Sequence, residues 1–418
     1  MHTLTRRQFT SAAAAAAVPL SAPSAIGTAL TPEMKSFTDP ETGRRVKQFT
    51  TAAANSYPLY YFTPSITSDG RYCVIHSERS GWVQLYRLDL DSGAMVQLTN
   101  GTDRESGWFI WCEGHLRGIF NHLSALNLVR REVYYFQDEQ VRSTHLDTLA
   151  NRVVMKIPGR RSIGQTSFSP DGRHFAFIHA DARLFRERFA DREALLNMRL
   201  GGWEGHEAWR NTVPSTIGVI ETATGKYRDV IRLDFHCHHV IFGDNQTLLV
   251  NHIQNRPGMW SIRIDGSGRK DLQPLVHQVV TERGIFYEQP KSGPIENWFG
   301  CFDLKTGKSE EVPLPIADGY VHTGLDPAGK FLFFENSGKT HELISFHFPF
   351  LRERTRFRTI RRIEPYPQRG GQRYHAHPFL SPDRKWMFHT AVVEGFAQVS
   401  AVEVADLVDL DEYWDRRA

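Results

Sequence analysis

Short apolar segments separated by tight turns recur along the chain, and this pattern determines the expected fold. Ser381-Pro-Asp-Arg is followed by the apolar segment Lys385-Trp-Met-Phe-His, and Asp326-Pro-Ala-Gly is followed by Lys330-Phe-Leu-Phe-Phe. Pro-Asp and Asp-Gly pairs at such places are typical of hairpin turns. Seven turns of this kind begin at Thr67, Val129, Ser169, Gly243, Thr281, Asp326 and Ser381. Short strands that recur about every 40 to 70 residues predict an all-β fold, a seven-bladed β-propeller.

The same pattern predicts how the ring closes and where it is interrupted. The chain after Ile26, through Lys47-Gln-Phe-Thr, is expected to lend the closing strand to the last blade. The third blade carries a long insertion from Ala180 to Pro214, of which Asp181 to Leu200 is predicted to be helical. Its basic and aromatic residues are Arg183, Arg186, Arg188, Arg192, Arg199, Trp203, His206, Trp209 and Arg210. Guanidinium groups and indole faces suit a carboxylated sugar polymer, although a solvated helix with ordinary surface charge is the alternative.

The first 25 residues have the pattern of an export signal. Thr5-Arg-Arg-Gln-Phe-Thr resembles a twin-arginine motif, Ala12 to Ala17 form a short apolar region, and Ser21-Ala-Pro-Ser-Ala offers small residues for cleavage. We therefore expect a signal peptide over 1–25, a propeller domain over 26–418, and a periplasmic or secreted protein. No other run approaches the roughly 18 apolar residues that span a bilayer, so no membrane contact is expected after signal removal.

Charge and cysteine content exclude several classes of protein. The formal net charge is +3, from 50 basic and 47 acidic residues, which does not indicate a nucleic-acid partner. Four isolated cysteines, Cys73, Cys112, Cys237 and Cys301, fit neither a zinc ribbon nor a dense disulfide framework. The chain lacks a Gly-x-Ser-x-Gly elbow, which a propeller-linked serine peptidase requires. We expect a monomer.

Candidate chemistry is concentrated between Gln372 and His377. Gln372, His375 and His377 place three metal-competent groups within six residues. If the two histidines lie on a strand, side chains two apart share one face, and Gln372 then belongs to the preceding loop. Two imidazoles and an amide oxygen, with no thiolate and no carboxylate, suit a divalent ion that keeps open positions. The alternative is two histidines that merely lie on a polar strand face.

A second pattern connects this motif to the rest of the propeller. Polar residues stand four positions before the hairpin turn in six repeats, and these are Thr63, Gln165, His239, His277, His322 and His377. In a propeller this position lies on the innermost strand, at the rim of the central channel. A ring of convergent polar groups at a channel mouth is a candidate site, although a water-filled polar channel is the alternative.

The sequence Gln372-x-x-His375-x-His377-Pro resembles the metal motif of oligogalacturonate lyases, a pectin-degrading polysaccharide lyase family with a seven-bladed propeller. The resemblance extends over most of the chain after the signal, and it includes Tyr60-Tyr-Phe-Thr-Pro and Met259-Trp260. It implies a metal, usually manganese, held by Gln372, His375 and His377 together with His322.

The resemblance also implies catalytic roles. The family's base matches His277, and His239 becomes a plausible substrate-binding residue. The family's assisting arginine precedes its Met-Trp pair, whereas Gly258 precedes Met259 here, and the nearest arginine is Arg256. We assign the arginine role to Arg256, with Arg373 as a further candidate for substrate binding.

These assignments predict a metal-dependent lyase that cleaves uronate-containing, acidic oligosaccharides by β-elimination and leaves a 4,5-unsaturated end. Such a reaction needs a base and a positive charge near the uronate carboxylate. It does not need the paired carboxylates of a glycoside hydrolase, and the sequence offers no convincing pair. The alternative function is an exported, non-catalytic propeller that binds a partner or acts as a scaffold.

Overall fold

The computed structural model describes most of the chain after the predicted signal. The described residues are 25–102, 118–119, 123–189, 213–237, 239–251, 258–272, 276–290, 297–314, 320–325, 331–336, 342–347, 358–364 and 372–408. The predicted signal peptide, apart from its last residue, lies outside them. So do Arg256, residues 190–212 of the predicted third-blade insertion, and the side chains of Gln372 and His277.

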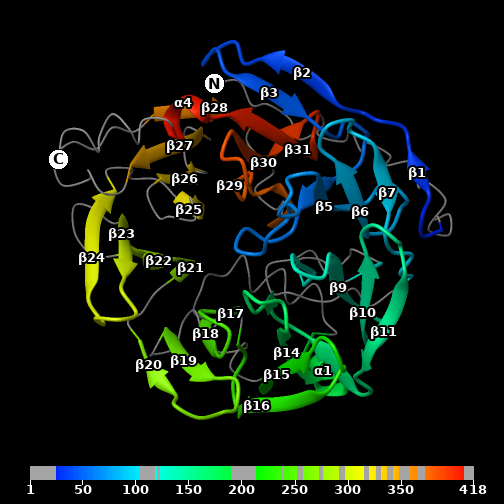
Figure 1. Ribbon diagram of the computed structural model, residues 1–418, viewed down its shortest axis with the longest axis vertical. Coiled ribbons are helices and arrows are strands. Elements are labelled where there is room, and N and C mark those ends of the chain that lie inside the picture. Colours follow the sequence, from blue (N-terminus) through cyan, green and yellow to red (C-terminus); the bar gives the residue numbers. More distant parts are fainter. Residues whose placement is uncertain are drawn as a thin grey trace, which may run out of the picture.

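The described strands form seven antiparallel sheets of four or five strands arranged in a ring (Figure 1). Sheet 1 contains β4 (Ser56–Pro58), β5 (Tyr72–Ser77), β6 (Gln84–Asp89), β7 (Met95–Gln97) and β1 (Ala29–Leu30). Sheet 2 contains β8 (Ala125–Asn127), β9 (Glu132–Gln137), β10 (Gln140–His145) and β11 (Asn151–Lys156). Sheet 3 contains β12 (Arg160–Ser162), β13 (Ser167–Phe168), β14 (His174–Asp181), β15 (Ser215–Glu221) and β16 (Tyr227–Leu233).

The second half of the chain continues the ring. Sheet 4 contains β17 (His239–Phe242), β18 (Thr247–Asn251), β19 (Met259–Arg263) and β20 (Lys270–Asp271). Sheet 5 contains β21 (Val276–Thr281), β22 (Gly284–Pro290), β23 (Asn297–Phe302) and β24 (Ser309–Leu314). Sheet 6 contains β25 (Tyr320–Leu325), β26 (Phe331–Asn336), β27 (Glu342–His347) and β28 (Arg358–Arg362). Sheet 7 contains β29 (Phe379–Leu380), β30 (Trp386–Val393), β31 (Phe396–Glu403), β3 (Arg45–Gln48) and β2 (Lys35–Thr38). The expected all-β propeller is thereby confirmed.

The closing strand comes from the start of the described chain, as the sequence predicts. β3 pairs antiparallel with β31, with Val46 opposite Val402, and β2 pairs with β3. Meanwhile β1 pairs with β7 of sheet 1. The segment from Ala29 to Gln48 therefore joins the first and last sheets, and this closes the ring.

Three of the hairpin turns share one hydrogen-bond pattern, which explains their Ser/Thr-x-Asp signature. The Ser381 hydroxyl donates to Asp383 and accepts the backbone N–H of Trp386 at 3.0 Å. Ser169 and Thr67 make the corresponding bonds to Asp171 and Asp69. The hydroxyl thus satisfies the first backbone donor of the following strand while the aspartate fixes the turn.

The hydrophobic core lies between neighbouring sheets. Between sheets 2 and 3, Tyr134 and Phe136 pack against Phe175 and Phe177, all fully buried. Strands that face such layers on both sides are buried along their length, as β5 is at all six positions. This explains why their sequences read as continuous apolar runs instead of strict alternation.

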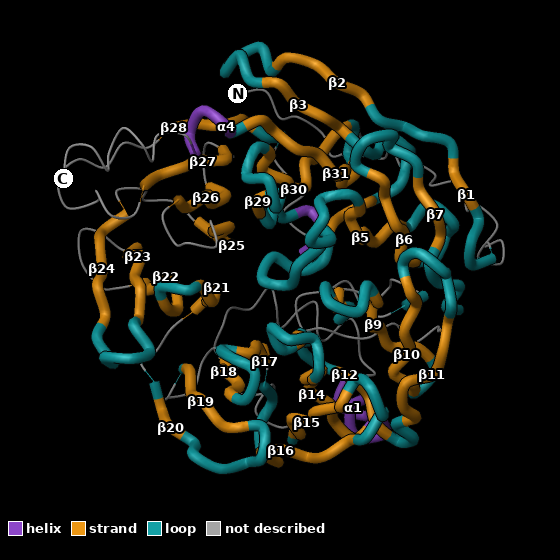
Figure 2. Tube along the Cα trace, in the orientation of Figure 1, coloured by secondary structure: helices purple, strands orange, loops and turns teal. Residues whose placement is uncertain are grey.

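Helices are few among the described residues (Figure 2). They are α1 (Ala182–Phe189), α4 (Ala405–Val408) and the 3-10 helix η2 (Gln372–Tyr374). Asp181 accepts the backbone N–H of Leu184 at 2.7 Å and caps α1 where the predicted helical insertion begins. The rest of that insertion lies outside the described residues, so the helical insertion as a unit stays a prediction. No helix in the described part of the chain has both the length and the apolar character needed to cross a bilayer.

Candidate metal centre

Sheets 6 and 7 bring three metal-competent side chains together at the centre of the ring. His322 lies on β25, Glu335 on the neighbouring β26, and His375 in the loop between η2 and β29. Glu335 Oε1 lies 2.8 Å from His375 Nδ1, and Glu335 Oε2 lies 4.0 Å from His322 Nδ1. One ligand atom from each residue lies within 4.8 Å of the others. Nitrogen and carboxylate donors at this spacing suit a divalent transition metal.

His377 completes the group from the same loop. Its ring centroid lies 4.2 Å from that of His322 and 5.8 Å from that of His375. Its backbone N–H donates to Glu335 Oε2 at 3.1 Å. The structure therefore brings together His322, His375 and His377, three of the four predicted ligands.

One expectation for this site is wrong. His375 and His377 do not lie on a strand, because η2 ends at Tyr374 and β29 begins only at Phe379. His377 has a φ of 43°, a left-handed conformation that interrupts regular strand geometry. The motif itself offers no carboxylate, but the structure places one beside it, since the fully buried Glu335 lies close to both His322 and His375.

A close approach of two backbones makes this arrangement possible. A Cβ placed on Gly324 of β25 would lie 2.0 Å from the Pro378 carbonyl oxygen. Only glycine lets the loop that carries His377 lie against β25 at this distance. β25 is itself irregular at this point, with a register shift between Val321 and Thr323 and a φ of 50° at His322.

Two tyrosines pack against the histidines. The Tyr60 ring lies 5.1 Å from His377 and 5.7 Å from His239, and the Tyr61 ring lies 5.0 Å from His322. Tyr60 thus connects His239, the first residue of β17, to the histidines of the candidate metal centre. His239 is buried and forms an isolated bridge with Gln165 of the previous repeat, which agrees with the predicted ring of inner positions.

The other predicted site residues are placed less directly. Gln372 begins η2, and His277 lies on β21, the inner strand of sheet 5, but their side chains and all of Arg256 are outside the described residues. Arg373 donates to Glu78 at 2.7 Å and stacks on Tyr374, with only 11% of its side chain exposed. Its guanidinium group therefore ties the histidine loop to sheet 1.

Sequence reasoning missed Glu335 and gave Tyr60 and Tyr61 no role. A signal for Glu335 exists, because this carboxylate directly follows the apolar run Phe331-Leu-Phe-Phe. A buried charge of this kind is rare unless it is paired or coordinates a metal. The pairing of Tyr60 and Tyr61 with histidines in distant repeats has no local signal.

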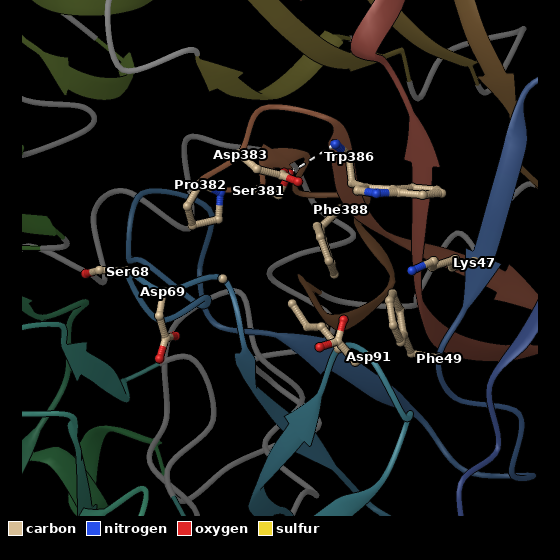
Figure 3. Close-up of a pocket in the computed structure, with 12 residues that line it drawn as sticks. Lys47, Phe49, Ser68, Asp69, Asp91, Ser381, Pro382, Asp383, Trp386 and Phe388 are labelled. Carbon is tan, nitrogen blue, oxygen red and sulfur yellow. Dashed lines mark hydrogen bonds between the residues drawn. The ribbon is translucent and has the colours of Figure 1, made fainter.

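A separate cavity of ≈ 420 Å³ lies beside the hairpin turns of sheets 1 and 7 (Figure 3). Phe49, Trp386 and Phe388 line its apolar part, and the ammonium group of Lys47 lies 4.9 Å from the centre of the Trp386 ring. The carboxylates of Asp69 and Asp383 accept hydrogen bonds within the turns. None of the metal-centre residues lines this cavity.

Comparison with known proteins supports the propeller fold. No family model and no curated protein sequence matches the chain. Among solved structures, the chain is similar to an oligogalacturonate lyase in complex with manganese, with a TM-score of 0.75 and 18% identity over 92% of this chain and 100% of that chain. An oligogalacturonate lyase from Vibrio parahaemolyticus gives a TM-score of 0.74 and 16% identity over 91% and 99% of the two chains. The Cps50 (Swd1) β-propeller domain of Myceliophteria thermophila gives a TM-score of 0.52 and 10% identity over 85% of this chain and 99% of that chain.

The fold and these similar structures define the class as β-propeller proteins. Within that class, the likeness to oligogalacturonate lyases that the motif residues indicate is confirmed at the level of structure. At 16% to 18% identity the likeness establishes the fold. The activity has to be argued from the site itself.

Proposed function

We propose that this chain is a metal-dependent polysaccharide lyase that cleaves uronate-containing oligosaccharides by β-elimination. The observation that carries the proposal is the clustering of His322, His375 and His377 around the buried Glu335. It occurs in a propeller similar in structure to two oligogalacturonate lyases, one of them in complex with manganese.

The residues present fit a divalent metal. We propose His322, Gln372, His375 and His377 as its ligands and manganese as the ion, because imidazole and oxygen donors without thiolate suit Mn²⁺. When bound, such an ion supplies a positive charge beside the substrate carboxylate and so acidifies the neighbouring C–H bond.

The proton itself is assigned to a residue of the chain. We propose that His277 accepts the C5 proton through a neutral imidazole nitrogen. The electron pair of the C5–H bond forms the C4=C5 double bond, and the C4–O bond breaks. The departing oxygen takes a proton from water and becomes the hydroxyl group of the released sugar, and His277 later returns the C5 proton to the solvent.

The remaining predicted residues support this reaction in different ways. Arg256 is proposed to bind the substrate carboxylate or the bridging oxygen, and His239 to line the sugar site beside Tyr60. For Arg373 we favour a supporting role in place of substrate contact, since its guanidinium group is bound to Glu78. Residues 1–25 are proposed to direct export, which places the enzyme in the periplasm or outside the cell.

A panel of uronate oligosaccharides tests the proposal. The manganese-loaded protein is incubated with oligosaccharides of different uronic acids, and formation of the conjugated 4,5-unsaturated product is followed by its ultraviolet absorbance. We expect product from at least one acidic oligosaccharide and none from neutral ones. If no uronate gives product and the protein binds no stoichiometric metal, the exported, non-catalytic binding propeller is the better interpretation.

A further inference from the structure

Glu335 occupies an unusual position for a carboxylate. Its side chain has no exposed surface, and it follows the four apolar residues that begin β26. Burial of an unpaired carboxylate costs several kcal/mol or more, so the group needs donors in its immediate surroundings. Within the described part of the chain, both ion-pair contacts of Glu335 are with histidines, His322 and His375.

The two oxygens of Glu335 contact the histidine loop separately. Oε1 lies 2.8 Å from His375 Nδ1, and Oε2 accepts the backbone N–H of His377 at 3.1 Å. One carboxylate therefore fixes both the ring of His375 and the backbone beside the ring of His377. This carboxylate lies on sheet 6 and contacts the loop that leads into sheet 7, and Glu335 is 40 positions from His375 in the chain.

The contact with Glu335 determines which nitrogen of His375 carries the proton. A carboxylate oxygen accepts a hydrogen, so His375 carries its proton on Nδ1, and Nε2 keeps the lone pair with which an imidazole binds a metal. Metal-binding histidines commonly donate their second nitrogen to a carboxylate in this way, which fixes the ring and raises the basicity of the binding nitrogen.

We propose that Glu335 is the positioning residue of the metal centre. Its carboxylate orients the ring of His375 and the backbone of His377, and it does not itself bind the ion. The inference rests on the metal site of the proposed function, but it holds for any activity that the metal serves. Each oxygen of Glu335 accepts a hydrogen bond from the histidine loop, Oε1 from the ring of His375 and Oε2 from the backbone N–H of His377, and this is the arrangement of a supporting carboxylate.

The substitution Glu335→Gln tests the proposal, because it keeps the size of the side chain and removes its charge. Mn²⁺ affinity is measured on the full chain by titration, with free Mn²⁺ detected by electron paramagnetic resonance. We expect the affinity to fall about 10- to 100-fold while the fold is retained. The matched control is Glu132→Gln, which removes another buried carboxylate, in sheet 2, and leaves Mn²⁺ affinity unchanged.

Two further measurements separate a positioning role from the alternatives. X-ray absorption of the manganese-loaded proteins is expected to show the same number of ligands with and without Glu335, and loss of one oxygen ligand in Glu335→Gln would make Glu335 a ligand. Nitrogen-15 NMR of the histidines is expected to show His375 protonated on Nδ1 in the native protein and a mixture of tautomers in the variant.

Two controls separate this inference from misfolding of the variant and from failure of the proposed function. If Glu335→Gln does not fold, Glu335→Asp keeps the charge on a shorter side chain, and it is expected to bind Mn²⁺ more weakly than the native protein. Native Mn²⁺ affinity in Glu335→Gln, or in a folded Glu335→Asp, overturns this inference alone. Failure of the native protein to bind Mn²⁺ overturns the metal site of the proposed function as well.

Discussion

Two histidines of the metal centre hold backbone conformations that histidine rarely adopts. His322 and His377 have φ values of 50° and 43°, and each such conformation costs of order 1–3 kcal/mol unless its surroundings enforce it. Both residues are buried, and the backbone N–H of His377 is fixed by Glu335. This combination of strained backbone and buried polar side chains is typical of a functional site.

The first prediction at the residue scale concerns the proposed base. We expect His277→Ala to retain metal and fold but to lose about 10²- to 10⁴-fold in elimination rate, since a positioned base contributes that much. The native rate should rise with pH through one ionisation in the histidine range, and that ionisation should vanish in the variant. Unsaturated product at the native rate from His277→Ala would remove this residue from the mechanism.

The second prediction concerns Arg373. Its ion pair with Glu78 is largely buried, so Arg373→Ala is expected to reduce the free energy of unfolding by about 1–3 kcal/mol, measured by urea denaturation. Because Arg373 ties the histidine loop to sheet 1, metal affinity should fall in parallel. Arg45→Ala serves as the control, since it removes an exposed ion pair with Glu403 on the closing strand. An unchanged metal affinity together with a raised KM would restore the substrate-binding role.

At the scale of elements, the hairpin turns and the closing strand could be predicted because their signals are local. The Ser169 and Ser381 turns are specified within four residues by a hydroxyl and an aspartate. The histidine loop could not be predicted in the same way. Its conformation depends on Glu335 from another sheet and on the close approach at Gly324, neither of which local sequence encodes. The pattern therefore identified three histidines that lie together but not the geometry that holds them.

The prediction at this scale concerns Gly324. A methyl group here would lie 2.0 Å from the Pro378 carbonyl, so Gly324→Ala must push the histidine loop away from β25. We expect a lower melting temperature and weaker Mn²⁺ binding. Gly243→Ala is the control, because its added methyl meets only the flexible side chain of Leu249, at 3.2 Å. Equal metal affinity in the two variants would show that the close contact is not needed for the site.

At the scale of the whole molecule, the propeller buries several histidines in neutral form. Burial lowers the pKa of His76 and of His179 to about 4, and it lowers that of His389 well below its usual value, with the guanidinium of Arg361 as a further cause. Arg361 donates to His389 Nε2 at 2.9 Å, where sheet 6 meets sheet 7. Protonation of these imidazoles is therefore coupled to unfolding.

The pH prediction follows from the sign of these shifts. Between pH 4 and 6.5 the unfolded chain binds protons that the folded chain does not, so acid favours unfolding. The contribution of these histidines is fully present above pH 6.5 and is lost as the pH falls toward 4. We expect the free energy of unfolding to rise with pH across this window, by up to about 1.4 kcal/mol per pH unit for each histidine, and their contribution to level off above it. A stability that is flat from pH 4.5 to 6.5 in urea titrations would contradict this account.

The most direct test of the central claim combines metal content with product formation. The native protein and the double variant His375→Ala/His377→Ala are stripped of metal, reloaded with Mn²⁺, analysed for bound metal and supplied with the most active uronate oligosaccharide. We expect about one ion per native chain and ultraviolet-absorbing product only after reloading, and neither metal nor product in the double variant. Full metal content in the double variant, or undiminished product formation by the stripped native protein, would contradict the assignment of this chain as a metal-dependent lyase.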